Sequence, residues 1–270
     1  MMIPKIIHYC WFGKQPLPEK AQECIDSWRK FCPDYKIIEW NESNFDFNSC
    51  QYAREAYECK KWAFVSDYAR FWILYNYGGL YFDTDVELIH DINEIVIEGP
   101  FMGSEPSEEK CRVAAGLGLG VYPHHPLYKE ILDYYQSLRF IISDHVYNDE
   151  TIVTYITDIA QKHGYVGDNT IEQIGDISIY PPEFFCPMDM KTGQLHITEK
   201  TKSIHWYTAS WKDETETRIH NRAVEIYNKY NNAIGRLISE VYESTAKTLY
   251  YIRVEGLSSV TRRILRKLSR

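Results

Sequence analysis

Two aspartates separated by a single residue, Asp83 and Asp85, are the strongest chemical signal in the 270-residue sequence. They follow Leu80-Tyr81-Phe82, a short apolar and aromatic run that is typical of a buried strand. Side chains two residues apart in a strand point the same way, so we expect the two carboxylates to converge. Converging carboxylates repel each other unless a cation or a shared proton lies between them. We therefore interpret this position as a divalent-metal site.

A second pair of polar side chains lies in the segment before this strand. Asp67 and Arg70 are three residues apart in a predicted helix, so they share one helical face. The helix is expected to stop at Gly78 and Gly79, which supply the positive φ of a C-cap or tight turn. The alternative for Asp67 and Arg70 is an ion pair on the protein surface, which would add little stability.

The residues that follow the motif exclude two other known types of Asp-x-Asp site. A phosphatase of the haloacid type carries Thr or Val at the fifth position of its nucleophile motif, where this chain has Glu87. An EF-hand loop requires glycine at the sixth position, which is Leu88. The remaining interpretation is a Mg²⁺ or Mn²⁺ ion that is held by few carboxylates and completed by a substrate phosphate.

The composition is that of a protein with a substantial buried core, because 44% of the residues are hydrophobic. The formal net charge of −8 disfavours a nucleic-acid-binding surface, so we expect no nucleic-acid partner. No run approaches the roughly 20 apolar residues of a membrane span, and the N-terminus lacks the apolar core of a signal peptide. Seven cysteines without a CxxC pair predict free thiols. We therefore expect a cytoplasmic location.

The C-terminal end differs in charge from the rest of the chain. Residues 247–270 contain seven basic side chains and one acidic side chain. Leu257, Val260, Ile264 and Leu268 have the spacing of one helical stripe. A basic amphipathic helix of this kind can lie on an anionic membrane surface, so residues 257–270 are a candidate peripheral contact with the inner face of a membrane. The alternative is a solvated helix that packs on the body of the protein.

The order of predicted elements indicates an α/β protein that opens with a β-α-β unit and hence a parallel sheet. We expect an α/β domain over residues 1–215 and a helical extension over residues 216–270. Strands are predicted at Ile3–Phe12, Tyr35–Trp40, Leu80–Val86, Ile177–Tyr180 and Ser203–Tyr207. Helices are predicted at 18–31, at 51–77 in two pieces, and at 127–142, 151–163, 218–230 and 233–250.

Three motifs in the chain resemble those of one enzyme family. The run FVSDYARFWILYNYGGLYFDTDV resembles the signature of the DXD-containing sugar transferases of glycosyltransferase family 32. That family includes bacterial capsule and lipopolysaccharide transferases, yeast mannosyltransferases and, more distantly, the clostridial glucosylating toxins. IPKIIHYCWFG near the N-terminus and SIHWYTASW further on resemble the family's first strand and its C-terminal motif, so the similarity spans residues 3–211.

This resemblance implies a GT-A fold, a nucleotide-sugar donor, a bound Mn²⁺ or Mg²⁺ ion, and transfer with retention of configuration. By position in the motifs, Asp83 and Asp85 would hold the metal, which would act as a Lewis acid on the donor diphosphate. Asp67 and Arg70 match the helix residues that grip the donor sugar and ribose. With Asp85 they are the residues we expect to act in catalysis.

Three further residues match positions near the donor in the family. Trp11 would stack on the nucleotide base, although a core tryptophan is the alternative. Tyr81 would contact the donor, with a core aromatic as the alternative, and Ser66 would lie near the nucleotide.

The C-terminal motif provides the last candidates. His205 is the natural third metal ligand, since imidazole suits Mn²⁺ among oxygen donors. The sequence departs from the family at Trp206, where a second histidine is usual, so His205 would act alone. Ser210, Trp211 and Lys212 follow and could reach the diphosphate.

The sequence thus predicts a metal-dependent retaining glycosyltransferase. It would move a hexose from a nucleotide sugar, with a UDP-sugar as the leading donor, to a glycan or lipid-linked acceptor in bacterial surface polysaccharide synthesis. GDP-mannose is the main competing donor. A non-catalytic glycan-binding protein on the same fold and a metal phosphohydrolase are the rival functions. No catalytic base is assigned, because a front-face mechanism is the usual proposal for retaining enzymes of this type.

Overall fold

The computed structural model describes residues 1–143, 146–148, 150–208, 214–230, 232–256 and 260–261. The chain divides into two compact units. The N-terminal unit consists of Met1–Met188 and Leu195–Tyr207, and the C-terminal unit consists of Asp189–Gln194 and the residues from Thr208 onward.

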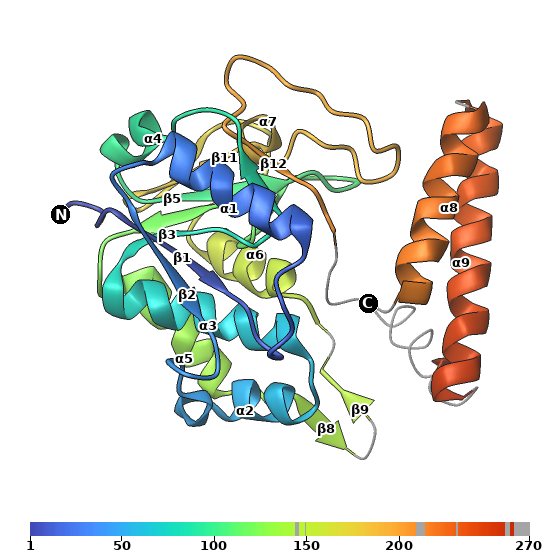
Figure 1. The fold of residues 1–270 in the computed structure, drawn as a ribbon, viewed down its shortest axis with the longest axis horizontal. Helices are drawn as coiled ribbons and strands as arrows, with labels where there is room; N and C mark the ends of the chain where they lie inside the picture. The colour runs from blue at the N-terminus through green and yellow to red at the C-terminus, as the bar shows by residue number, and fades with distance from the viewer. Residues whose placement is uncertain (144–145, 149, 209–213, 231, 257–259, 262–270) are drawn as a thin grey trace. The chain divides into compact units, whose positions relative to one another are not determined.

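The N-terminal unit is built on a mixed β-sheet that confirms the predicted α/β class (Figure 1). In the described part of the chain, the strands run in the spatial order β10 (Glu172–Ile174), β11 (Ile177–Tyr180), β5 (Phe101–Glu105), β7 (Leu119–Val121), β3 (Gly79–Tyr81), β1 (Ile6–Cys10) and β2 (Lys36–Trp40), and β6 (Arg112–Val113) pairs with β5. The opening is parallel as predicted, because β1 pairs in parallel with β2 and β3. The whole sheet is mixed, since β7 runs antiparallel to both β3 and β5.

Helices cover both faces of the sheet and divide the core into two clusters. Alternate strand residues face opposite sides: Leu80 belongs to one cluster and Tyr81 to the other. The Leu80 side is covered by α1 (Glu19–Phe31), α4 (Asn93–Glu98) and α7 (Pro182–Phe185). The Tyr81 side is covered by α2 (Gln51–Glu58), α3 (Trp62–Tyr77), α5 (Pro126–Gln136) and α6 (Ile152–Lys162), with the short 3₁₀ helix η1 (Phe47–Ser49) beside α2.

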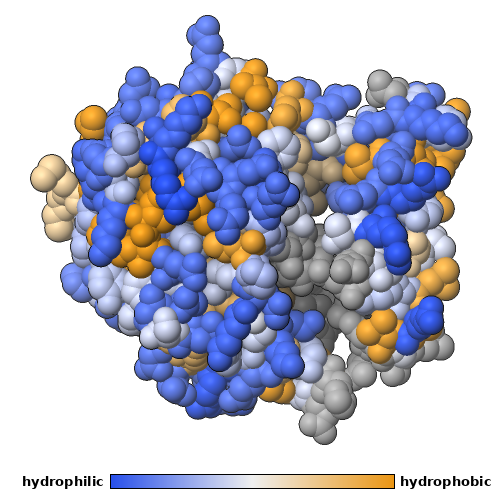
Figure 2. All heavy atoms as spheres, viewed as in Figure 1, coloured by the Kyte–Doolittle hydropathy of each residue, from blue (hydrophilic) through white to orange (hydrophobic). Residues whose placement is uncertain are grey.

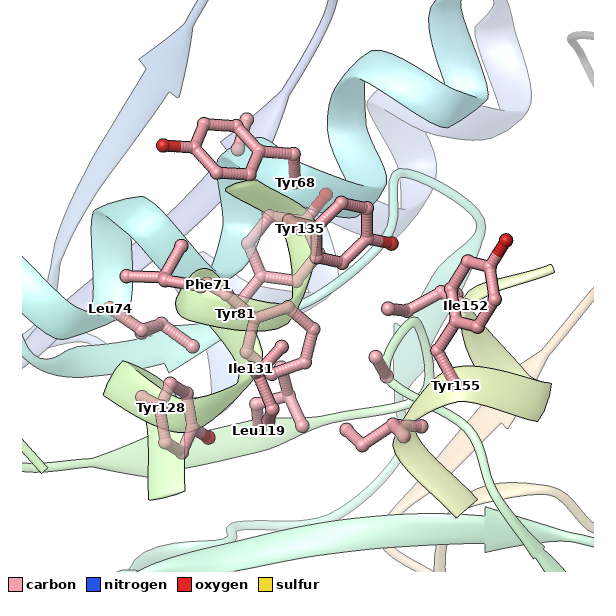
Figure 3. Packing of buried hydrophobic residues seen from close by; sticks show 14 of the residues in the cluster. Tyr68, Phe71, Leu74, Tyr81, Leu119, Tyr128, Ile131, Tyr135, Ile152 and Tyr155 are labelled. Carbon is pink, nitrogen blue, oxygen red and sulfur yellow. The ribbon is translucent and has the colours of Figure 1, made fainter. Parts of the chain in front are cut away.

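Aromatic side chains hold α3 in place on this second face. Tyr135 of α5 lies near both Tyr68 of α3 and Tyr155 of α6, with ring centroids 5.8 and 6.0 Å apart (Figure 3). Phe71 of α3 packs against Tyr128 of α5 at 5.3 Å. Tilted and edge-to-face pairs of this kind add to the energy of burial, so α3 presents its polar residues from a rigid position.

The predicted strand Leu80–Val86 is wrong as a single strand. β3 ends at Tyr81, and a new strand, β4 (Val86–Leu88), begins after a turn in which the Val86 amide donates to the Asp83 carbonyl at 3.0 Å. β4 leaves the main sheet and pairs antiparallel with β12 (Ser203–His205). Aspartate is disfavoured in strands and common in turns, which explains the break between Asp83 and Asp85.

The predicted helix 127–142 is too long. α5 ends at Gln136, and the following chain forms β8 (Ile141–Ser143), which pairs with β9 (Val146–Tyr147). The buried Glu55 carboxylate accepts the backbone N–H groups of Phe140 at 2.9 Å and Ile141 at 3.0 Å. These amides are therefore bound by a side chain from α2 instead of by a helical turn.

The C-terminal unit contains the two helices that the sequence predicted, α8 (Glu214–Tyr230) and α9 (Ala233–Glu255). Asn232 caps α9 by accepting from the Gly235 amide at 2.9 Å, and the Ser239 hydroxyl of α9 donates to the Ala223 carbonyl of α8 at 2.7 Å. Large apolar side chains of α9 are nevertheless exposed, and Figure 2 shows hydrophobic atoms on this hairpin. They are Ile234, Leu237, Ile238, Val241, Leu249 and Val254.

Over the described ranges, no helix has both the length and the apolar character that crossing a membrane requires. Of the predicted apolar stripe at the C-terminal end, Leu257, Ile264 and Leu268 lie outside the described residues. Val260 is buried, so it does not present an exposed apolar surface as the stripe predicted.

Candidate active site

The turn between β3 and β4 brings together the three predicted metal ligands. One ligand atom from each of Asp83, Asp85 and His205 lies within 4.8 Å of the others. His205 arrives on β12, whose pairing with β4 places it opposite Val86. Its Nε2 atom lies 3.2 Å from Asp85 Oδ1. The convergence that the sequence predicted is present, but a turn and a second strand pair produce it instead of one continuous strand.

The donor set fits a divalent cation such as Mn²⁺ or Mg²⁺. The Asp83 side chain is 29% exposed, and those of Asp85 and His205 are 14% exposed, so the cluster is recessed yet accessible. Burial alone would lower the pKa of His205, but the nearby carboxylates of Asp85, Asp83 and Glu105 outweigh it and raise that pKa. The imidazole therefore lies in a concentration of negative charge that a cation would neutralise.

Arg70 of α3 links the metal cluster to the second predicted pair. Its Nη2 atom lies 3.1 Å from Asp67 Oδ1 and 3.2 Å from Asp83 Oδ1. Its Nε donates to the Ser66 carbonyl at 3.2 Å, and its side chain is only 5% exposed. Burial works against the charge, but Asp83 and its other neighbours outweigh burial and raise the pKa of Arg70. The alternative of a surface ion pair between Asp67 and Arg70 is therefore wrong.

Asp67 is buried on the same helix and has an unusual proton affinity. Burial raises its pKa to about 7, against the opposing effect of Arg70 and with a further increase from Asp83. A carboxyl group accepts a hydrogen bond from a sugar hydroxyl when it is ionised and can donate one when it is protonated.

Tyr81 is buried, and it orients the side chain of Asp83, one of the predicted metal ligands. Its hydroxyl donates to Asp83 Oδ1 at 3.0 Å, and the Arg70 guanidinium lies over its ring at 5.0 Å from the centroid. Burial raises the pKa of the phenol well above its ordinary value, so the hydroxyl remains a donor. These contacts make Tyr81 a core aromatic that also positions the Asp83 carboxylate.

Gly116 is a site residue that the sequence did not single out. The Asp83 amide donates to its carbonyl at 3.0 Å. A Cβ atom at this position would lie 2.0 Å from Asp83 Oδ2, so only glycine leaves room for the carboxylate. Nothing in the local sequence around Gly116 identifies Asp83 as its neighbour.

The other predicted residues are placed as follows. Trp11 is partly exposed and packs against the core cluster on the Leu80 side of the sheet, and its Nε1 donates to the Gln15 carbonyl at 2.6 Å. The Ser66 hydroxyl donates to the Trp62 carbonyl at 3.1 Å within α3. Ser210, Trp211 and Lys212 lie outside the described residues.

Comparison with known proteins identifies the segment that carries most of this geometry. Residues 18–102 match the family described as "Glycosyltransferase sugar-binding region containing DXD motif". The matched segment contains Asp67, Arg70 and both aspartates of the Asp-x-Asp motif. This segment is thus similar to the sugar-binding region of DXD-containing glycosyltransferases. The mixed α/β architecture agrees with the GT-A fold that the family resemblance implies.

Two curated proteins of similar sequence are fungal. The chain is 33% identical over 96 residues to "Inositol phosphoceramide mannosyltransferase 3" of Schizosaccharomyces pombe, which covers 31% of this chain and 24% of that protein. It is 26% identical over 111 residues to "Inositol phosphoceramide mannosyltransferase 1" of the same yeast, which covers 37% of this chain and 33% of that protein. The chain thus spans between a quarter and a third of these relatives' length.

Among solved structures, the chain is similar to the one titled "PaToxG Glycosyltransferase". The sequence identity is 18% and the TM-score is 0.45. The similarity covers 59% of this chain and 69% of that chain.

Proposed function

We propose that the chain is a metal-dependent retaining glycosyltransferase that moves a hexose from a nucleotide sugar to a glycan or lipid-linked acceptor. The observation that carries this proposal is the convergence of Asp83, Asp85 and His205 beside the buried Arg70. Binding of a glycan alone would not require such a combination of metal ligands and guanidinium. It is suited to holding a diphosphate together with its cation.

Each residue has a defined task in this proposal. Asp83, Asp85 and His205 would hold the ion, which would supply charge neutralisation for the departing nucleoside diphosphate. Arg70 is anchored by Asp67 and Asp83 and places its guanidinium beside the metal cluster. Asp67, with a pKa of about 7, offers a hydrogen bond to a sugar hydroxyl. Trp11 offers a partly exposed ring for a nucleotide base.

The donor is proposed to be a UDP-hexose, with GDP-mannose as the alternative. The two fungal relatives are named mannosyltransferases, and these names are the support for the alternative, in which the transferred sugar is mannose. The same names specify a lipid, inositol phosphoceramide, which supports a lipid-linked class of acceptor. A role in bacterial surface polysaccharide synthesis, on the cytoplasmic side of the membrane, is part of the proposal.

Donor hydrolysis with and without Mn²⁺, measured across UDP- and GDP-sugars, tests the activity. We expect turnover of one donor, which falls below detection in Asp85→Ala while the circular dichroism spectrum and Tm stay unchanged. Asp133→Ala is the matched control, because this aspartate is exposed on α5 and pairs only locally with Lys129. Failure of every donor to turn over with metal would refute the enzyme and favour the glycan-binding alternative. Cleavage of the donor to a nucleoside monophosphate and a sugar 1-phosphate, without release of a free sugar, would favour a phosphohydrolase.

We also propose that the C-terminal unit contacts an anionic membrane surface. The support is the basic sequence of residues 247–270 and the exposed apolar side chains of α9. Flotation with vesicles of phosphatidylglycerol and phosphatidylcholine tests this in the full-length chain. Replacing Leu237 and Val241 with Gln, both exposed at 57–62%, should reduce recovery with anionic vesicles. Equal recovery of variant and wild type, or equal recovery with neutral vesicles, would contradict membrane contact through this face.

A further inference from the structure

A three-residue network lies beside the metal cluster and is formed by Lys20, Glu87 and Trp206. The indole Nε1 of Trp206 donates to Glu87 Oε2 at 2.7 Å. The Lys20 ammonium donates to the same carboxylate oxygen at 3.0 Å and lies 4.2 Å from the centroid of the Trp206 ring. Each member therefore contacts both others, through a hydrogen bond, an ion pair and a cation–π contact.

The network lies at the end of the β4–β12 strand pair, next to the predicted metal ligands Asp85 and His205. Glu87 lies on β4, two residues after Asp85, and Trp206 directly follows His205 at the end of β12. The backbone amide of Trp206 donates to the Asp85 carbonyl at 2.9 Å. Lys20 comes from the first turn of α1 and ties both strands to that helix. A displacement of Trp206 would thus move His205 relative to Asp85.

The His205 imidazole depends on its backbone for orientation. A metal-binding histidine usually donates its second ring nitrogen to a carboxylate, carbonyl or water, which fixes the ring. Here Nδ1 is buried and has no hydrogen-bond partner in the part of the chain that the structure describes. Its neighbours are Asp85 at 3.2 Å and the Tyr207 ring, whose centroid lies 4.1 Å away. Neither contact fixes the ring as a hydrogen bond from Nδ1 would.

We propose that Lys20, Glu87 and Trp206 are positioning residues that set the affinity of the site for its divalent metal. They hold the backbone on which His205 approaches Asp85. The indole N–H of Trp206 anchors the end of β12 to Glu87 on β4. The inference rests on the metal role in the proposed function and extends it to residues outside the donor set.

Lys20 has a second carboxylate partner that provides a matched control. Glu23 also pairs with the Lys20 ammonium, at 3.1 Å, one turn along α1. Its side chain is 56% exposed, whereas that of Glu87 is 30% exposed. Removal of either glutamate takes one negative charge from Lys20. Only removal of Glu87 also releases the indole of Trp206.

The test is Mn²⁺ binding to the full-length chain, followed as the loss of the free Mn²⁺ signal in electron paramagnetic resonance. Loss of a group that orients a metal ligand typically weakens binding by about 10–100-fold. We therefore expect Glu87→Ala and Trp206→Phe to raise the Kd for Mn²⁺ by about 10-fold or more. Glu87→Gln still accepts the indole N–H and should remain within about threefold of wild type. Glu23→Ala should equal wild type.

The outcomes separate this inference from the proposed function. Absence of Mn²⁺ binding by the wild-type chain would refute the metal role itself. Wild-type binding with unchanged Kd in Glu87→Ala and Trp206→Phe would refute the positioning role alone. An equal loss in Glu23→Ala and Glu87→Ala would also refute it, because the effect would then be one of local charge. Tm values of all variants, measured without metal, show whether weaker binding reflects unfolding.

Discussion

Replacement of Gly116 by alanine is the sharpest single test of the site geometry. The new Cβ would lie 2.0 Å from Asp83 Oδ2 and 2.9 Å from its Cγ, whereas Cβ contacts under 3.0 Å are essentially never observed. The φ angle of Gly116 is not in the left-handed region, so the backbone itself accepts alanine. The carboxylate therefore has to move by at least about 1 Å, at a cost of about 1–3 kcal/mol typical of overpacking.

Function should suffer more than stability in this variant. A displacement of about 1 Å in a reacting constellation can reduce turnover by about 100-fold. We expect Gly116→Ala to weaken Mn²⁺ binding and to lower donor turnover by about that factor, with a urea-unfolding free energy reduced by about 1–3 kcal/mol. Isothermal titration calorimetry, a donor-hydrolysis assay and urea denaturation measure the three quantities.

A double-mutant cycle with Asp83→Ala decides whether the contact is the cause. In the Asp83→Ala background the carboxylate is gone, so adding Gly116→Ala should change the unfolding free energy by less than about 0.5 kcal/mol. If alanine at position 116 destabilises both backgrounds equally, the clash with Asp83 is not the origin. Wild-type metal affinity in Gly116→Ala would refute the reasoning outright.

Three further predictions concern buried polar groups. His8 is buried, and burial is the main reason that its pKa is lowered from 6.5 to about 4. As the pH falls, His8 is protonated in the unfolded chain before it is protonated in the folded chain, so the free energy of unfolding should fall by up to about 3 kcal/mol between pH 6.5 and pH 4. The variant His8→Gln should show a flatter dependence of the unfolding free energy on pH. An identical pH profile in urea titrations of His8→Gln would contradict this. Glu55→Ala orphans two backbone amides and should lower the unfolding free energy by about 2–4 kcal/mol, and a loss under about 0.5 kcal/mol in urea denaturation would show that water replaces the carboxylate. Arg70→Lys retains the charge but cannot bridge Asp67 and Asp83 in the same way, so donor affinity measured by calorimetry with Mn²⁺ should fall about 10–100-fold, whereas unchanged affinity would remove Arg70 from the donor site.

The sequence predicted which helices and strands form, but it did not predict where some of them end. The helix with Asp67 and Arg70 and the strand with Tyr81 follow from local spacing and apolar runs, and the structure has both. The turn at Asp83 was not predicted because the hydrophobic pattern resumes at Val86, which belongs to a different sheet. Such a change of sheet depends on a strand far along the chain, which local patterns do not show.

The same limit applies to the candidate site. Asp83 and Asp85 could be identified from their spacing, and His205 only through the family resemblance. Burial of the Asp67 and Arg70 pair and the closeness of Gly116 to Asp83 depend on packing between separate elements. The spacing of residues along the chain does not reveal contacts between separate elements, so these contacts could be identified only from the structure.

The pairing of β4 with β12 has a consequence for the order in which the chain becomes competent during synthesis. Glu87 and Trp206 are 119 positions apart, and His205 precedes the latter directly. A nascent chain can form β1, β2 and β3 long before His205 leaves the ribosome. Closing so long a loop is slow compared with forming local helices and turns. A growing or truncated chain would thus carry the aspartate pair without His205, and the proposed transferase activity would begin only when β12 has paired with β4.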